Sequence, residues 1–284
     1  MIAPPISPTP SATRSQNPAK QLLAPWLYRF GCKSYDRLRA TAFFVRSLGF
    51  DRKCPFCGLT LRRFVPYPGA ASPLFEHEHV VGGGPFENSE CPWCGSFERE
   101  RHVYLYLRDQ TNVLSRPVSI IHVAPERCLQ KVLRRSRCID YLSADLSSPR
   151  AELKCDLTRV PIDDNRFDVI LCNHVLEHIP DDRAAMRELL RVLKPNGWAM
   201  LQVPLAVSRA ETEEDLTIDG DEERLLRYGQ RDHVRLYGRD YADRLASVGF
   251  VVERHNTRLK FGDDYIRRHA LIPDDLIYIA RKPG

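Results

Sequence analysis

The stretch VSIIHVAPERCLQKVLRR, residues 118–135, decides the fold class of this chain. A mostly apolar run, Val118–Val123, precedes a turn with a proline, and apolar residues at helical spacing follow. The helical positions are Leu129, Val132 and Leu133. This order predicts a strand, a turn and a helix. A nucleotide-binding unit of this kind usually has glycines in its turn. Here the turn contains Ala124, Pro125, Glu126 and Cys128 and no glycine.

The chain after residue 118 continues to alternate between the two periodicities. Strands are predicted at 119–124, 138–146, 152–157, 167–176, 198–205, 251–256 and 275–282. One intervening helix is predicted to be capped by Asp181 or Asp182 and to end at the KPNG stretch, with Asn196 or Gly197 in a left-handed conformation. Because strands that alternate with helices form parallel units, the pattern predicts an α/β fold with a doubly wound sheet.

Polar residues stand where the predicted strands end, and an open parallel sheet binds its ligand at that edge. The second strand ends at Asp145, the third at Asp156, and the fourth at Asn173 and His174. A carboxylate after the second strand is placed to accept hydrogen bonds from both ribose hydroxyls. One after the third can bind the exocyclic amine of adenine. Each acid alone is explained as a surface turn residue, but together they favour an adenosine site.

The middle of the chain resembles the class I S-adenosylmethionine-dependent methyltransferases, and most closely the group with the type 11 pattern. The resemblance covers roughly residues 118–282. It is carried by YLSADLS around Asp145, CDLTRVPIDDNRFDVILCNHVLEHI at 155–179 and RELLRVLKPNGWAMLQVP at 187–204. It implies a Rossmann-like, mostly parallel sheet of seven strands and S-adenosylmethionine as cofactor. The implied cofactor-binding residues are Ala124, Pro125, Glu126, Asp145, Leu146, Asp156, Leu157, Asn173 and His174.

The turn after the first strand departs from that family's pattern of an acid followed by three alternating glycines. The matching positions hold His122, Ala124, Glu126 and Cys128. S-adenosylmethionine carries no phosphate, so this turn has less to bind than in dinucleotide enzymes. We therefore expect cofactor binding to persist, with Glu126 pairing with the ammonium group. The HVAPE and YGQRDHVRLYG stretches also resemble a bacterial group of zinc-ribbon methyltransferases that shares this proline turn.

Two near-identical turns, CPFCG at 54–58 and CPWCG at 91–95, precede the α/β region. A Cys-x-x-Cys turn directs two thiolates to one point, and two such turns form the tetrahedral sulfur site that Zn²⁺ favours. We therefore predict a small zinc-ribbon module with a structural zinc ion. Its ligands are Cys54, Cys57, Cys91 and Cys94. His77 and His79, between the turns, are expected to be loop residues because four cysteines complete the site.

The predicted organisation has four parts: a disordered tail (1–20), a basic helical segment (21–50), the zinc-ribbon module (51–100) and a methyltransferase domain (101–284). Within the last, 205–238 is expected to form a substrate lid. The sequence lacks a signal-peptide pattern and any run of about 18–20 apolar residues that would span a membrane. We expect a cytoplasmic protein whose nine cysteines are metal ligands or buried thiols rather than disulfides.

Methyl transfer is an in-line displacement in which the protein positions the acceptor and removes its proton. The candidate catalytic residues are His174 and His178 in NHVLEH, together with His233. We expect a small-molecule or glycan-type acceptor; the oligomeric state is left open. One alternative is an rRNA or tRNA methyltransferase. The basic first fifty residues favour it, whereas the mild net charge of +5 and the acidic run at 211–223 oppose it. The other is a non-catalytic interaction protein.

Overall fold

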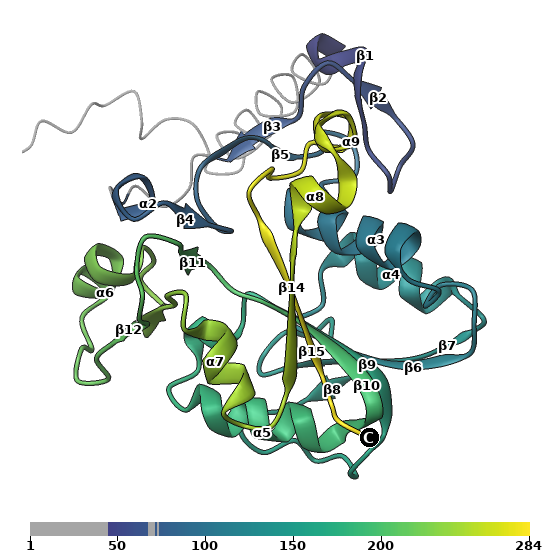
Figure 1. Cartoon of the computed structure of the whole chain (residues 1–284). Helices are drawn as coiled ribbons and strands as arrows, with labels where there is room; N and C mark the ends of the chain where they lie inside the picture. Colours follow the sequence, from purple (N-terminus) through teal and green to yellow (C-terminus); the bar gives the residue numbers. More distant parts are fainter. Residues whose placement is uncertain (1–44, 68–71, 73) are drawn as a thin grey trace, which may run out of the picture. The chain divides into compact units, whose positions relative to one another are not determined.

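The structure is a computed structural model that describes residues 45–67, 72 and 74–284 (Figure 1). The chain divides into two compact units, Met1–Arg46 and Ser47–Gly284, and everything below concerns the second unit. The predicted tail at 1–20 and most of the predicted helical segment at 21–50 lie outside the described residues. No helix in the described part of the chain is long and apolar enough to cross a bilayer.

A seven-stranded sheet is the centre of this unit, with the strand order β14–β15–β10–β9–β6–β7–β8. Its strands are β6 (Val118–Val123), β7 (Ile139–Asp145), β8 (Leu153–Lys154), β9 (Phe167–Asn173), β10 (Leu193–Gln202), β14 (Val251–Asn256) and β15 (Leu276–Arg281). β6 to β10 pair in parallel, and β15 is antiparallel to both of its neighbours. The prediction of an α/β fold with a doubly wound, mostly parallel sheet of seven strands is confirmed.

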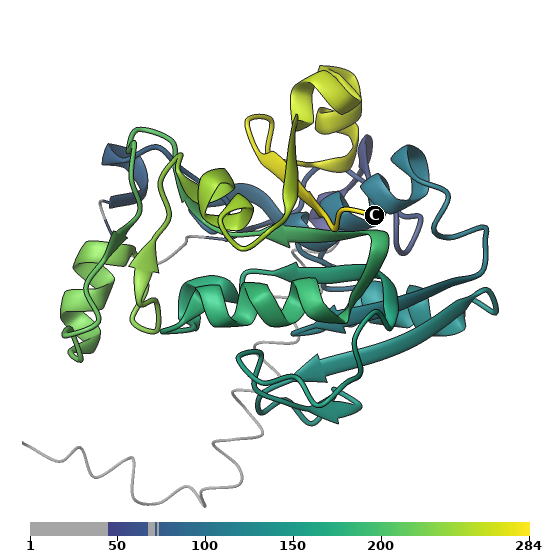
Figure 2. The same cartoon turned by 60° about the horizontal axis from the view of Figure 1, so that its bottom comes forward.

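Helices cover both faces of the sheet because successive strand residues point to opposite faces and both sets are apolar. α5 (Asp182–Val192) and α7 (Tyr241–Ala246) pack on one face, together with Ile170 and its neighbours. α3 (Glu98–Gln110) and α4 (Arg127–Arg135) pack on the other, together with Val169. Figure 2 shows α5 running along the strands of the sheet. The short helices α8 (Thr257–Phe261) and α9 (Asp263–His269) connect β14 to β15.

The strand order reverses at β6, which has β7 on one side and β9 on the other. In open α/β sheets the ligand binds outside the carboxyl ends of the strands at such a point. Asp145 ends β7, Asn173 ends β9, and Ala124 directly follows β6. The fold therefore brings the three predicted strand ends to one edge.

The cysteine turns lie among short strands that precede the sheet. These elements are β1 (Leu48–Lys53), β2 (Thr60–Leu61), β3 (Val65–Tyr67), α2 (Leu74–His77), β4 (Val80–Val81) and β5 (Phe86–Glu90). β1 pairs with β2, and β3 pairs with β5. β4 pairs with β11 (Leu205–Ala206), which follows β10. The segment between the two cysteine turns is thus joined to the segment that leaves the main sheet.

The segment predicted as a substrate lid contains regular structure. After β11 come β12 (Glu213–Glu214), α6 (Asp221–Tyr228) and β13 (Arg235–Leu236), and β12 pairs with β13. The acidic run at 211–223 is heavily paired with arginines. Glu213 and Asp215 form ion pairs with Arg227, and Glu222 forms one with Arg231.

The start of α5 agrees with the prediction, whereas its end does not. The carboxylate of Asp181 accepts a hydrogen bond from the backbone N–H of Ala184 at 2.8 Å, as an N-cap does. The helix stops at Val192, before the KPNG stretch, because Leu193 is extended and pairs with Phe167 at the start of β10. Asn196 has the predicted left-handed conformation, with φ of 62°, but inside β10.

Candidate functional site

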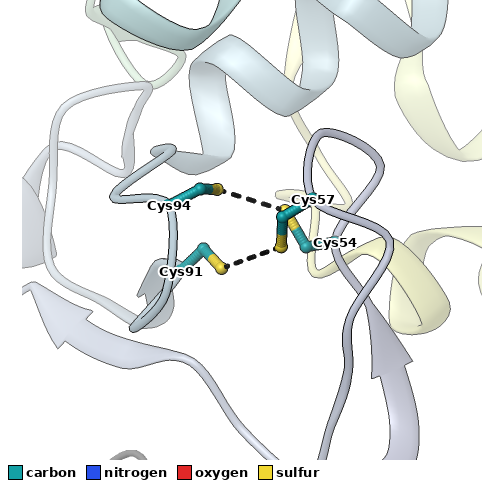
Figure 3. A group of neighbouring side chains, drawn as sticks. All are labelled: Cys54, Cys57, Cys91 and Cys94. Atoms are coloured by element: carbon teal, nitrogen blue, oxygen red, sulfur yellow. Dashed lines mark hydrogen bonds between the residues drawn. The ribbon is translucent and has the colours of Figure 1, made fainter.

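The four predicted zinc ligands meet at one point (Figure 3). Sγ of Cys54 lies 3.6 Å from Sγ of Cys94, and Sγ of Cys57 lies 3.9 Å from Sγ of Cys91. All four sulfurs lie within 4.8 Å of one another. Sulfurs on one zinc ion with Zn–S bonds of about 2.3 Å would be about 3.8 Å apart. The spacing therefore fits a tetrahedral four-sulfur site. His77 and His79 are not part of this cluster.

The two cysteine turns have the same backbone geometry. The N–H of Gly58 donates to the carbonyl of Cys54 at 2.9 Å, and the N–H of Gly95 donates to that of Cys91 at 2.9 Å. Both glycines have positive φ, 76° and 70°. A side chain would be strained at either position, so the glycines explain why the CPxCG pattern recurs.

Arg101 of α3 connects the cysteine turns to the rest of the unit. It is fully buried, and its guanidinium donates five hydrogen bonds of 2.8 to 3.0 Å, all to backbone carbonyls. The acceptors are Asn88, Ser89, Ser96, His269 and Ala270. A guanidinium has five N–H donors, so Arg101 is completely satisfied. Its positive charge also interacts with the sulfurs of Cys54, Cys91 and Cys94.

The predicted adenosine site is a cleft of about 600 Å³ at the carboxyl ends of the strands. Asp145 and Asp156 both line it. Oδ1 of Asp145 accepts hydrogen bonds from the backbone N–H groups of Ser147 and Ser148 at 2.8 and 2.7 Å. Oδ1 of Asp156 accepts two from Thr158 at 2.8 and 2.9 Å. Each turn fixes its carboxylate through one oxygen, so the second oxygen remains for a ligand.

Two leucines complete this end of the cleft. Leu157 is buried, with 5% of its surface exposed, whereas Leu146 is 65% exposed and borders the same cleft. An exposed large apolar side chain beside a cleft offers a surface on which a flat ring can stack. Both positions agree with their predicted place beside the adenosine part of a cofactor.

The glycine-free turn adopts the backbone conformation that glycines usually supply. Ala124 has φ of 47°, and its N–H donates to the carbonyl of Ala144 at 2.8 Å. The carboxylate of Glu126 makes a very short contact with Nε2 of His122, whose Nδ1 lies 3.0 Å from the hydroxyl of Tyr141. Burial alone would raise the pKa of Glu126, but the neighbouring His122 lowers it below the usual range. Glu126 therefore already has a partner within the protein, in addition to any cofactor.

Asn173 and His174 lie at the end of β9. Asn173 is 5% exposed, yet within the described part of the chain neither its Oδ1 nor its Nδ2 has a hydrogen-bond partner. Buried polar atoms without partners are rare, and at the edge of a cleft they are a reason to expect a ligand. His174 has φ of 54°, and its N–H donates to the carbonyl of Gln202. A Cβ on Gly82 would stand 3.4 Å from the His174 ring.

A second cleft of about 390 Å³ adjoins the first and shares Ala124, His174, His178 and Asp232 with it. Glu177 and His178 reach it from η2 (Leu176–His178), and His233 reaches it from the loop before β13. Nδ1 of His174 lies 3.5 Å from Oε1 of Glu177, and Nε2 of His178 lies 4.0 Å from the same oxygen. The structure thus brings the three predicted catalytic histidines together around a carboxylate.

Burial and charge act differently on the groups of this second cleft. Burial alone would raise the pKa of Glu177, but the hydrogen bond from His174 and the charges of the nearby histidines lower it below the usual range. Burial also lowers the pKa of His233, although Glu177 opposes that shift. At neutral pH the cleft therefore contains an ionised carboxylate beside a neutral imidazole.

Glu177 and Gly82 were not among the predicted site residues. Glu177 stands between two predicted histidines in NHVLEH, so its position in the sequence was a usable signal. No signal in the sequence pointed to Gly82, because His174, which lies beside it in the structure, is far away in the chain. Arg235 is fully buried and donates to the carbonyls of Leu176 and Pro180, so it holds the site together and does not line it.

Comparisons with known proteins agree with this location. Residues 123–201 match the model of a family described as a methyltransferase domain. A ubiquinone/menaquinone biosynthesis C-methyltransferase of Idiomarina loihiensis is 41% identical over 49 residues, which are 17% of this chain and 20% of that protein. The chain thus spans about a fifth of the curated relative that it matches. The prediction of a methyltransferase domain is confirmed for residues 123–201.

Solved structures with similar folds have low identity to this chain. An S-adenosylmethionine-dependent methyltransferase of Mesorhizobium loti is 15% identical, covers 64% of this chain and 98% of its own, and has a TM-score of 0.42. The 1,6-didemethyltoxoflavin-N1-methyltransferase of Burkholderia thailandensis is 16% identical, covers 64% and 76%, and has a TM-score of 0.38. The assignment of the fold rests on the strand order and pairing described above.

Proposed function

We propose that this chain is an active S-adenosylmethionine-dependent methyltransferase with a small-molecule acceptor and a structural zinc ion. One observation carries the proposal. Asp145 ends β7, Asp156 follows the adjacent β8, and both carboxylates line one cleft beside the Ala124 turn, within the residues that match the methyltransferase domain. Each is fixed by its own turn, so the cleft is preorganised before any ligand arrives.

The residues present fit S-adenosylmethionine. Asp145 is placed for the ribose hydroxyls, Asp156 for the adenine amine, and Leu146 and Leu157 for the faces of the ring. The unpartnered amide of Asn173 is suited to the ammonium and carboxylate of the methionine part, since an amide both donates and accepts. Ala124 and Pro125 form the turn against which that part would lie, with Glu126 behind it.

The residues of the second cleft would position the acceptor and remove its proton. When bound, S-adenosylmethionine supplies an electrophilic methyl group. We assign proton removal to His174, because it lines both clefts, is 15% exposed, and is held by Glu177. The acceptor loses its proton to His174 and forms the new bond to the methyl carbon. In this in-line displacement the carbon–sulfur bond would break in the same step, with its electron pair left on sulfur.

A small-molecule acceptor is supported by the form of the site. The second cleft, of about 390 Å³, is lined from several separate segments, including Gly83 and Gln230. The segment at 205–238 contributes Asp232 and His233 and would act as the substrate lid. The relative from Idiomarina loihiensis is by name a C-methyltransferase of quinone biosynthesis, which also favours a small acceptor over a glycan or a nucleic acid.

A structural zinc ion is supported by the spacing of the four cysteine sulfurs. The eight cysteines in the described part of the chain are all free, which also supports a reducing compartment and the cytoplasmic location. The ion would fix the two turns relative to each other in a module that has little apolar core of its own.

The test is calorimetric titration of the zinc-loaded protein with S-adenosylmethionine. We expect saturable binding that Asp145→Asn weakens by about 10- to 100-fold, since a hydrogen bond to a charged group contributes about 1.5–3 kcal/mol. Asparagine retains the acceptor for the turn, so this variant should stay folded. Asp163→Ala removes an exposed turn acid outside the cleft and should bind as the wild type does. A folded wild type that binds no cofactor would refute the proposal.

A further inference from the structure

Glu177 is a buried carboxylate that lacks a full set of partners. It is 1% exposed, and its Oε2 has no hydrogen-bond partner among the residues that the structure describes. The ion pairs of Glu177 within the described residues are all with histidines, His174 and His178. An ionised carboxylate away from water requires a positive partner or several donors. The free oxygen therefore points to a cation that binds at this place.

The hydrogen bonds of two neighbouring histidines fix which ring nitrogen faces inward. Nδ1 of His178 lies 3.1 Å from the carbonyl oxygen of Asp232, and Nδ1 of His233 lies 3.1 Å from that of Tyr228. A carbonyl oxygen only accepts, so each Nδ1 carries the hydrogen and each Nε2 has a free lone pair. Metal-binding histidines are usually oriented in this way, by a hydrogen bond from the other ring nitrogen.

Three ligand atoms converge as a result. Glu177, His178 and His233 each offer one, and the three lie within 4.8 Å of one another. Two ligand atoms on one ion, with bonds of about 2.1 Å, are at most about 4.2 Å apart. The 4.0 Å between Nε2 of His178 and Oε1 of Glu177 already meets this limit. A carboxylate and two imidazole lone pairs have no hydrogen to share, so an ion is the partner that satisfies all three.

The two segments that supply the ligands are fastened to each other. The N–H of Val234 donates to the carbonyl of Glu177 at 2.9 Å. Arg235 donates to the carbonyl of Leu176 at 2.8 Å, and its side chain is fully buried. The backbone of η2 is therefore fixed to the segment around β13 by one main-chain hydrogen bond and by one buried arginine side chain.

We infer that Glu177, His178 and His233 bind a divalent first-row transition-metal ion, separate from the cysteine cluster. Two histidines and one carboxylate suit such ions and leave coordination positions open. The group borders the cleft assigned to the acceptor. This inference rests on the proposed function. It adds that the acceptor belongs to a class of molecules that present an oxygen atom to the ion. A bound ion would lower the pKa of that oxygen, and His174 would be placed to take its proton.

The test is titration of the metal-free full chain with Co²⁺, followed by absorption and by the bound metal per chain. We expect two equivalents in the wild type. One should show sulfur-to-cobalt charge-transfer absorption, and the other only the weak bands of a nitrogen and oxygen site. Glu177→Gln and His233→Asn should each weaken the second equivalent by at least about 100-fold, since even losing a partner of a ligand costs 10- to 100-fold.

The control is His255→Asn. His255 forms a similar pair with Glu253, 3.2 Å apart, but no described residue offers a third ligand there, so both equivalents should remain. The charge-transfer band also reports that a variant is folded. A single equivalent in the wild type, or a second one that survives Glu177→Gln, would overturn the inference. Titration of the same samples with S-adenosylmethionine tests the proposed function separately, since neither ligand set includes Asp145.

Discussion

Ala124 carries the backbone of the cofactor turn in a conformation that alanine rarely adopts. Its φ of 47° lies in the left-handed region, where a Cβ is unfavourable and glycine is not penalised. The family pattern has glycines in this turn, and the sequence analysis expects cofactor binding to persist without them. The structure shows that the turn forms with alanine and tolerates the strain, since the N–H of Ala124 donates a hydrogen bond to the carbonyl of Ala144.

Ala124→Gly should therefore leave the stability unchanged or increase it by up to about 1 kcal/mol, because it relieves this strain at the expense of a more flexible unfolded chain. Urea denaturation measures the change in unfolding free energy. Ala144→Gly is the matched control: it stands in β7, is fully buried and should destabilise. If both variants were destabilised equally, the turn would not be strained.

The sequence predicts individual site residues best where both the residue type and its spacing in the chain reflect its chemistry. It predicted Asp145 and Asp156 from their places after strands and the four cysteines from their spacing, and the structure brings each set together. It did not predict Glu177 as a site residue, although Glu177 stands between two predicted histidines, since the proposed ligand set also needs His233, which is far away in the chain. Such pairings arise only when η2 and the loop before β13 are folded against each other.

Hydrogen bonds to one carboxylate connect strands β6, β9 and β10 near their amino ends, opposite the clefts. The carboxylate of Asp168 accepts hydrogen bonds from the hydroxyl and N–H of Ser119 at 2.6 and 2.8 Å, and from Nζ of Lys194 at 2.9 Å. Partial burial raises the pKa of Asp168, but these donors outweigh it and lower the pKa to about 2. One carboxylate thus links three strands.

Asp168→Asn should lower the unfolding free energy by about 1 kcal/mol at neutral pH, a value reduced for partial exposure. Because the pKa is lowered in the folded state, the contribution is complete above the ordinary value near 4 and disappears as the pH falls toward 2. Denaturation of both proteins between pH 6 and about 3 checks this. Asp140→Asn breaks an exposed pair with Arg166 and should cost little. A pH-independent difference for Asp168→Asn would contradict the assignment.

Elements were predictable where pattern and capping agreed. The strands of the sheet follow from apolar runs, and the start of α5 follows from Asp181. The end of α5 was misplaced because the helical pattern continues through Leu193. The pairing of Leu193 with Phe167 draws it into β10, and such a competition between helix and sheet is decided by tertiary contacts.

The cysteine turns and the sheet belong to one compact unit, Ser47–Gly284. Arg101 donates to carbonyls of both the cysteine-turn segment and the end of α9. The proposed zinc ion therefore supports more than its own turns. The sequence predicted the ligands but not this connection, because nothing in the CPxCG pattern encodes which helix the turns contact.

Cys91→Ser should remove one zinc equivalent per chain and lower the unfolding free energy by more than about 4 kcal/mol, as loss of a structural metal does. Metal analysis and urea denaturation give the two values. Cys138→Ser changes an exposed, free thiol and is the control. Unchanged zinc content in Cys91→Ser would exclude the cysteine cluster as the metal site.

The pairing of β4 with β11 has a consequence for how this protein can be dissected. It places Gly82 against His174 and joins the segment between the cysteine turns to the strand that leaves β10. Cutting the chain at residue 101 would leave β11 without its partner and strip one wall from the second cleft. The segment that contains the cysteine turns therefore cannot be removed without changing the second cleft. Any truncated or chimeric version of this protein must therefore keep the cysteine-turn segment together with the sheet.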